Sequence, residues 1–384
     1  ASALPERTLV EGPYQYVVQG EGPYTILGLL QTIKDGSMAL DKVPGLWFKK
    51  DGKPVGNAMA EKIKDLDKEL PAQAWDLLDM SLYRAHNWHC FDHIDKRQPY
   101  ASLQTSLGCP YKCSFCCINA PFGGSGIRYW SPENIIAQID VLVNKYGVKN
   151  IKIPDEMFVL NEKHVLGICD LIIERGYDLN IWAYARVDTV KEKFIGKLKQ
   201  AGFRWLALGI ESGSKQVRDG VEKGRFGDVD IDAVVSKIRA AGIYVCANYI
   251  FGLPDDTNES MQETLDMALR LNTEWANFYS AMAYPGSQLY TLALQNNLPL
   301  PEDWLGYSQH AFETLPLPTA TLSGAEVLAF RDKAFKEYYT SPAFLSMMRE
   351  KFGANVVEHL VQMTKYDLKR KHVPTRSSRQ EARV

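Results

Sequence analysis

Apolar and polar positions change period repeatedly through the middle of the chain. Short apolar runs, which suit buried strands, alternate with longer stretches whose apolar residues recur at helical spacing. The strands are predicted at Tyr100–Leu107, Asn150–Pro154, Leu179–Val187, Trp205–Ile210, Tyr244–Phe251 and Trp275–Ala283. The helices between them are predicted at Pro132–Tyr146, His164–Gly176, Lys191–Gly202, Ile231–Gly242 and Met261–Leu271. This order, with parallel and largely apolar strands, predicts a curved α/β barrel.

The polar signals of this region lie where the predicted strands end. They are Asp155, Glu156, Arg186, Glu211, Gly252 and Tyr284. In α/β barrels the carboxyl ends of the strands carry the functional site, so these residues are candidates for one site. For Asp155 and Glu211 an alternative stays open, in which the carboxylate only caps the helix that follows.

The segments before the barrel follow other patterns. Residues 14–18 predict a short strand, residues 24–33 an amphipathic helix, and residues 46–55 a hairpin that turns at Asp51-Gly52. One strand and two helices cannot bury a sheet alone, so residues 1–40 are expected to be the end of a larger domain.

The segment after the barrel is predicted to be helical, with helices near 323–339, 342–352 and 356–368. The sequence therefore predicts five parts. They are a domain end at 1–40, a hairpin and linker at 41–98, a barrel at 99–296, a helical substrate-shaping region at 297–371, and a disordered polar tail at 372–384.

Composition narrows the class of protein. The 384 residues carry a formal net charge of −2 with mixed signs, which gives no electrostatic case for nucleic acid or an anionic membrane. We find no apolar run near the ~20 residues of a membrane-spanning helix and no secretory signal. The seven cysteines are spaced too unevenly for a disulfide framework. These features predict a cytoplasmic, reduced protein.

Three of the cysteines stand close together, at Cys109, Cys113 and Cys116, in a C-x3-C-x2-C pattern that follows the first predicted strand. Such thiolates can hold three corners of an iron–sulphur cluster, which normally takes four ligands, and the missing ligand leaves one iron open. A zinc or redox site is the alternative for a C-x2-C pair, but it does not explain the third cysteine. Cys117 as a fourth ligand would give a closed site.

This spacing, with Phe115 before the third cysteine, resembles the motif of the radical S-adenosylmethionine (SAM) enzymes. The resemblance implies a [4Fe–4S] cluster on Cys109, Cys113 and Cys116, whose open iron chelates SAM. It also implies reductive cleavage of SAM to a 5′-deoxyadenosyl radical, electrons from a flavodoxin- or ferredoxin-type donor, and contact of Phe115 with the adenine side.

The strand ends fit the chemical groups of SAM within that resemblance. Arg186 can grip a carboxylate with two donors, while Asp155, Glu156 and Glu211 can accept from an ammonium or a ribose hydroxyl. Glu211, in Gly-Ile-Glu-Ser-Gly, resembles the ribose-binding carboxylate of the family. The turn that contains Gly252 is expected to contact adenine. Tyr284-Pro-Gly resembles the end of the sixth strand in cobalamin-dependent members.

The resemblance extends to the cobalamin-associated class of these enzymes. Residues 1–40 look like the closing section of its Rossmann-like cobalamin-binding domain, residues 66–80 like its linker, and residues 338–342 like its C-terminal extension. The family's Asp-x-His-x-x-Gly segment, which carries the cobalt ligand, is absent from these residues. Either the chain is truncated or this relative has lost the cofactor.

The class implies methylation of an unactivated carbon or phosphorus centre with cobalamin as a cofactor. A cyclase or rearrangement enzyme without methyl transfer is the alternative, and a zinc-binding structural protein a remote one. A small molecule, a lipid or a peptide would each suit the predicted pocket as substrate.

One further group resembles a metal site. His86, His89, Cys90 and His93 would share a face if helical, although a linker with ordinary aromatic contacts explains them equally. Among strand residues, Tyr249 and Tyr284 are candidates to face the substrate, and Cys246 is a candidate hydrogen-atom donor. The alternative for each is ordinary packing.

Overall fold

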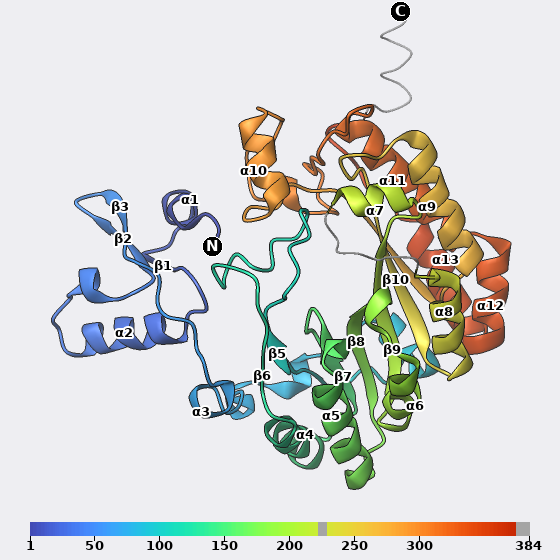
Figure 1. The fold of residues 1–384 in the computed structure, drawn as a ribbon, viewed down its shortest axis with the longest axis horizontal. Helices are drawn as coiled ribbons and strands as arrows, with labels where there is room; N and C mark the ends of the chain where they lie inside the picture. Colours follow the sequence, from blue (N-terminus) through green and yellow to red (C-terminus); the bar gives the residue numbers. More distant parts are fainter. Residues whose placement is uncertain (222–228, 374–384) are drawn as a thin grey trace, which may run out of the picture.

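The computed structural model describes residues 1–221 and 229–373. A small N-terminal unit, a curved sheet with helices, and a group of C-terminal helices follow one another along the chain (Figure 1). The strands are β1 (Tyr16–Val18), β2 (Leu46–Lys50), β3 (Lys53–Gly56), β4 (Tyr100–Ser102), β5 (Ser106–Leu107), β6 (Arg128–Tyr129), β7 (Asn150–Ile153), β8 (Asn180–Arg186), β9 (Phe203–Glu211), β10 (Tyr244–Phe251) and β11 (Trp275–Ser280). The α-helices are α1 (Pro5–Glu11), α2 (Pro23–Lys34), α3 (Leu66–Glu69), α4 (Pro132–Tyr146), α5 (Glu162–Arg175), α6 (Glu192–Gln200), α7 (Lys215–Gly220), α8 (Ile231–Ala240), α9 (Asn258–Leu271), α10 (Gln288–Gln295), α11 (Gly324–Tyr339), α12 (Pro342–Phe352) and α13 (Ala354–Thr364).

The central sheet is parallel throughout, with the strand order β11-β10-β9-β8-β7-β4. The predicted α/β barrel architecture is confirmed, and the sheet curls rather than closing on itself (Figure 1). The first predicted strand differs from expectation because it divides in two. Its first part, β4, forms the sheet edge, whereas β5 leaves the sheet and pairs antiparallel with β6.

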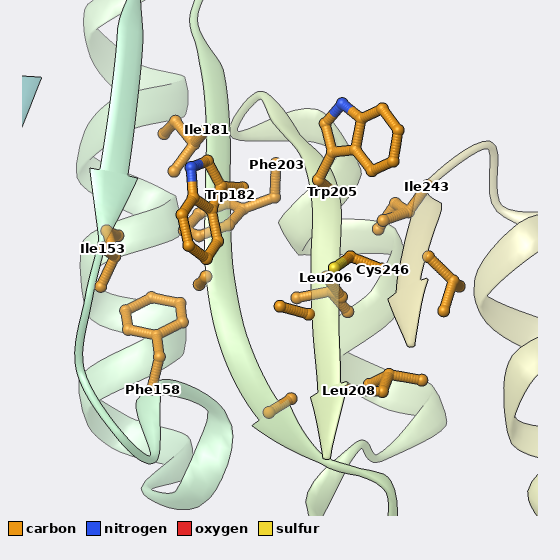
Figure 2. Packing of buried hydrophobic residues seen from close by; sticks show 14 of the residues in the cluster. Ile153, Phe158, Ile181, Trp182, Phe203, Trp205, Leu206, Leu208, Ile243 and Cys246 are labelled. Atoms are coloured by element: carbon orange, nitrogen blue, oxygen red, sulfur yellow. The ribbon is translucent and has the colours of Figure 1, made fainter. Parts of the chain in front are cut away.

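Side chains alternate between the two faces of this sheet, as the period of a strand requires. On one face Ile151, Ile153 and Ile181 are fully buried in a core shared with residues of the surrounding helices. Figure 2 shows Ile153, Ile181 and Phe158 beside this part of the sheet. We call this the helix-covered face. The opposite, concave face carries Arg186 and the alternate residues of each strand.

The concave face is closed at the amino end of the strands by an aromatic cluster around Trp88. This residue opens a 3-10 helix, Trp88–His93. Its ring centroid lies 4.9 Å from that of Trp182, 5.1 Å from Trp205 and 6.4 Å from Trp275. Aromatic pairs at these distances attract one another beyond the area that they bury. The segment Trp88–His93 therefore closes the amino end of the barrel.

The edge of the sheet at β11 is covered by α11. The amide of Ala276 donates to the Tyr339 hydroxyl oxygen (3.1 Å), and that hydroxyl donates to the Ala276 carbonyl (2.7 Å). Tyr338 donates in the same way to the Thr273 carbonyl (2.5 Å). These contacts satisfy edge groups that would otherwise invite pairing with another chain.

The N-terminal unit is a small antiparallel sheet of the order β1-β2-β3 with α1 and α2. The predicted hairpin is confirmed, with positive φ at Asp51 (51°) and Gly52 (77°). Because β1 pairs with β2, residues on both sides of the predicted boundary at residue 40 share one sheet. The outer side of α2 leaves an apolar stripe exposed, formed by Ile26, Leu27, Leu30 and Ile33.

The C-terminal helices also follow the prediction. Ser323 caps α11 through a reciprocal capping box with Glu326, and α12 and α13 follow directly. Most of the predicted tail, residues 374–384, lies outside the described residues. Among the helices of the described ranges, none combines the length and apolarity that crossing a bilayer requires.

Candidate functional site

The three predicted cluster ligands lie in a long loop, residues 108–127, that joins β5 to β6. The neck of this loop is closed by the β5–β6 pairing and by a hydrogen bond from the Gly126 amide to the Cys109 carbonyl (3.0 Å). Gly108 has a positive φ of 89°, and a Cβ there would stand 2.5 Å from the Gly126 carbonyl oxygen. The backbone therefore requires glycine immediately before the first cysteine.

A Gly108→Ala variant is expected to lose about 1–3 kcal/mol of unfolding free energy, because it combines a left-handed φ with a backbone clash. It should also hold less iron after reconstitution. Gly147→Ala is the matched control, since Gly147 has a φ of 64° but open space around its Cβ position. Urea unfolding and iron analysis compare the two, and equal iron content in both variants would contradict this account of the neck.

The middle of the loop is anchored to the barrel by Ser114, which is buried. Its amide donates to the Val221 carbonyl (3.0 Å), and its own carbonyl accepts from the Leu289 amide (2.9 Å). The neighbouring Phe115 packs against small apolar clusters that include Leu253 and Ala281. The loop therefore lies over the carboxyl ends of β10 and β11, as the sequence predicts for a site at the strand ends.

The thiols of this loop differ in exposure: Cys109 is buried, Cys113 and Cys117 are partly buried, and Cys116 is exposed. Within the described residues no three His, Cys, Asp or Glu side chains are grouped to hold a single metal ion.

Arg186 connects the end of β8 with the cysteine loop. Its Nε and Nη2 donate to the Asp188 carboxylate (2.9 and 2.8 Å), and its guanidinium lies 3.9 Å from the centre of the Tyr111 ring. Arg186 thus faces the loop, as predicted. Two donors of the guanidinium, which the sequence assigned to a cofactor carboxylate, are therefore already used by Asp188.

Glu156 is the strand-end residue whose environment most clearly calls for a ligand. Its Oε2 atom is buried and has no hydrogen-bond partner among residues 1–221 and 229–373, and burial raises the pKa of the carboxyl to about 7. The charge of Glu156 also contributes to the raised pKa of the Cys109 thiol, after the larger effect of burial, so the two groups lie near each other. A buried acceptor without a donor beside the cysteines fits an ammonium or hydroxyl group of a cofactor.

The Glu156→Gln variant of the cofactor-free protein should be more stable than the wild type at pH 8. A carboxyl whose pKa is raised on folding costs stability above that pKa, and the cost disappears as pH falls below the unfolded value near 4.5. We therefore expect the difference in melting temperature to be largest at pH 8 and to shrink at pH 5. Glu162→Gln is the control, because the exposed Glu162 is paired with Lys193. A pH-independent difference would contradict the assignment.

The adjacent carboxylate, Asp155, is fully buried, and protein groups donate hydrogen bonds to both of its oxygens. It accepts from the Thr105 amide (2.8 Å), the Thr105 hydroxyl (2.6 Å) and the Ser106 hydroxyl (2.6 Å). His164 Nε2 lies 2.8 Å from the same Thr105 hydroxyl. These bonds make Asp155 a positioning residue that fixes the root of the cysteine loop. They support neither helix capping nor the predicted cofactor contact, which stays a prediction.

The three remaining predicted residues also lie at the strand ends. Glu211 is buried with a φ of 69°, a conformation that costs a non-glycine residue about 1–3 kcal/mol and clusters at functional sites. The Gly252 amide donates to Asp256 Oδ2 (2.9 Å), so that donor is not left for adenine. The Tyr284 hydroxyl accepts from Gln309 Nε2 (3.2 Å), which ties it to the C-terminal region.

The second metal-like group, His86, His89, Cys90 and His93, does not point towards one common site. His89 Nε2 lies 2.9 Å from the Asn180 carbonyl, and Cys90 Sγ donates to Asn150 Oδ1 (3.4 Å), while His86 and His93 are exposed. His89 and Cys90 therefore make the ordinary contacts that the linker alternative expects.

Of the candidate substrate-facing residues, Tyr249 follows the alternative of ordinary packing. It is fully buried on the helix-covered face and stacks on Phe278 (5.5 Å between ring centroids). Cys246 is also buried, and its sulphur accepts from Asn277 Nδ2 (3.5 Å).

Sequence reasoning missed the residues that hold the site together, which are Thr105, Ser106, Tyr111, Ser114 and His164. Thr105-Ser106 did carry a signal, since two hydroxyl residues interrupt an apolar strand just before the cysteines. Ser114 and Tyr111 carried none, because their contacts are with segments far away in the sequence.

Comparison with known proteins places this geometry in a family. Residues 103–268 match the family model of the radical SAM superfamily. An uncharacterised methyltransferase from Pyrococcus horikoshii is 33% identical over 305 residues, which are 79% of this chain and 63% of the relative. The anaerobic magnesium-protoporphyrin IX monomethyl ester cyclase of Rubrivivax gelatinosus is 25% identical, over 88% of this chain and 59% of its own length. This chain thus spans about three fifths of the length of these relatives.

The fold is also that of a solved enzyme. OxsB, a cobalamin-dependent SAM radical enzyme solved with aqua-cobalamin and SAM bound, superposes with a TM-score of 0.67. The match covers 95% of this chain and 56% of OxsB, at 17% identity, a level that establishes the fold alone. The cysteine loop and most of the strand-end residues lie within this matched segment, and we conclude that residues 103–268 form a radical SAM domain.

Proposed function

We propose that this protein cleaves SAM reductively and uses the resulting radical, with cobalamin, to methylate an unactivated carbon or phosphorus centre. The observation that carries the proposal is the buried Glu156 Oε2, which has no hydrogen-bond partner among the described residues and lies near the loop of Cys109, Cys113 and Cys116. When bound, the [4Fe–4S] cluster would supply one electron and an open iron for the aminocarboxylate of SAM. Cys109, Cys113 and Cys116 are its proposed ligands.

The chain's own residues would orient SAM. Glu156 accepts from the ammonium group, and Glu211 accepts from the ribose, held in place by its constrained backbone. Arg186 lends positive charge to the carboxylate side while it braces Tyr111. Phe115 offers an apolar surface near Leu253 for the adenine. A flavodoxin- or ferredoxin-type electron donor and a cytoplasmic location complete the proposal.

Methyl transfer is favoured by the methyltransferase name of the relative that is 33% identical over most of this chain. The cobalamin part of the proposal draws on the N-terminal resemblance and on the fold shared with OxsB. Residues 1–85 contain no histidine, so they offer no imidazole for cobalt. No step is therefore assigned to residues of the N-terminal unit.

A second candidate is ring formation or rearrangement without methyl transfer. The similarity to the Rubrivivax cyclase over 88% of this chain favours it. The two candidates share SAM cleavage and differ only in the fate of the substrate radical.

The test is anaerobic incubation of the reconstituted protein with SAM, dithionite and methylcobalamin, followed by mass spectrometry. Methyl transfer predicts cobalamin-dependent S-adenosylhomocysteine together with 5′-deoxyadenosine. Deoxyadenosine with no S-adenosylhomocysteine at any cobalamin concentration would reject methyl transfer in favour of the second candidate.

A further inference from the structure

Lys152 is a cation on the concave face of the sheet that the proposed chemistry does not use. It lies in β7, and its neighbours in register are Ser102 and Trp182. Its ammonium group is 4.9 Å from the centre of the Trp182 ring and 6.0 Å from that of the Tyr184 ring. The nearer ring is that of the register neighbour, and Tyr184, two residues further along β8, also lies within 6.0 Å of the ammonium.

No carboxylate partners this cation. Within the described residues its ammonium group makes no ion pair or hydrogen bond, although the side chain is partly buried. Burial lowers its pKa, and the nearby His86 has a pKa that the charge of Lys152 helps to lower. The aromatic contacts replace only part of the hydration that this half-desolvated charge loses, so an anion from outside would stabilise it further.

The concave face beyond Lys152 is not fully covered. The concave-facing side chains Tyr184, Asn248, Asn277 and Tyr279 remain partly accessible. The residues between them on the helix-covered face, such as Ala183, Ala247 and Phe278, are buried. Two tyrosine rings with amide groups beside them suit the flat body of an organic molecule with few polar atoms.

We propose that Lys152 binds an anionic group of the substrate, a carboxylate or a phosphate, and that Tyr184 and Tyr279 contact an aromatic body between that group and the cysteine loop. This inference rests on the proposed function, because it assigns the substrate class of the same site. Glu156 lies four positions after Lys152, at most about 13 Å of extended chain.

The test uses the cofactor-free protein and three naphthalene probes: 2-naphthoate, 2-naphthyl phosphate and the neutral 2-naphthamide. Isothermal titration of the wild type should show at least one of the two anions binding about tenfold more tightly than the amide, as an ion pair worth about 1.4 kcal/mol provides. Whether the carboxylate or the phosphate binds more tightly identifies the anion. In Lys152→Met the preference should vanish, whereas in Lys149→Met, which removes an exposed lysine, it should remain.

Stability separates this role from a structural one. Methionine keeps the contact with the aromatic rings and removes an unpaired charge, so the melting temperature of Lys152→Met should equal or exceed that of the wild type. A marked fall would indicate that the lysine supports the fold and would overturn the proposal. Anion preference unchanged in Lys152→Met, or absent from the wild type, would overturn it as well.

These outcomes are independent of SAM cleavage because no cofactor is present in the titrations. Anion binding through Lys152 in a protein that forms no deoxyadenosine would refute the proposed function and leave this binding site standing.

Discussion

Cys113→Ala protein, reconstituted anaerobically with iron and sulphide, should lose most of its cluster and form no deoxyadenosine. Cys113 is the central one of three proposed ligands, and a cluster that keeps two protein thiolates on this loop lacks a stable site. The loop itself should survive, because Ser114 and the Gly126–Cys109 bond hold it without the cluster. Iron and sulphide analysis with electron paramagnetic resonance of the reduced protein measures the loss.

Cys117→Ala is the matched control, since Cys117 belongs to the same loop and its thiol is partly buried like that of Cys113. It should keep its cluster and its SAM cleavage. Loss of the cluster in both variants would mean that four cysteines close the site and that no iron remains open. Equal cluster content in Cys113→Ala and the wild type would exclude Cys113 as a ligand.

Replacing Asp155 with alanine should produce the largest loss of stability among the strand-end residues. The substitution leaves the Thr105 amide and the hydroxyls of Thr105 and Ser106 buried without their acceptor. Each unsatisfied buried donor costs about 1–3 kcal/mol, so we expect a total loss of roughly 4 kcal/mol or more. Urea unfolding of the cofactor-free protein, followed by circular dichroism, measures this loss.

The Asp155→Asn variant keeps one acceptor oxygen and should lose distinctly less. Both variants should also reduce iron loading, because β5 carries the root of the cysteine loop. If Asp155→Ala unfolds like the wild type but no longer retains SAM, then Asp155 contacts the cofactor directly, as the sequence first suggested, and the positioning role is wrong.

The sequence was most informative where side chains repeat with a regular period. The strands β7 to β11 and the C-terminal helices were predictable because burial on one face imposes that period locally. The same logic identifies the face of Tyr249, which shares its parity with Val245 and Ala247, both buried on the helix-covered face. Reading that parity from the sequence would have removed it from the substrate candidates.

The parts that could not be predicted depend on contacts between distant segments. The pairing of β1 with β2 joins residues on either side of a helix, and no local signal announces it. Likewise, Asp155 and Glu156 are adjacent carboxylates in the turn after β7. Only the position of Thr105 in space decides which of the two receives hydrogen bonds. Thr105 donates to Asp155, and Glu156 keeps a buried oxygen without a partner among the described residues.

The measurement that tests this account most directly is deoxyadenosine formation by the reconstituted wild-type protein. Anaerobic incubation with SAM and dithionite, followed by mass spectrometry, should yield 5′-deoxyadenosine that is absent from the Cys113→Ala control. A wild-type protein that carries a full cluster and forms none would contradict the assignment of this site to radical SAM chemistry.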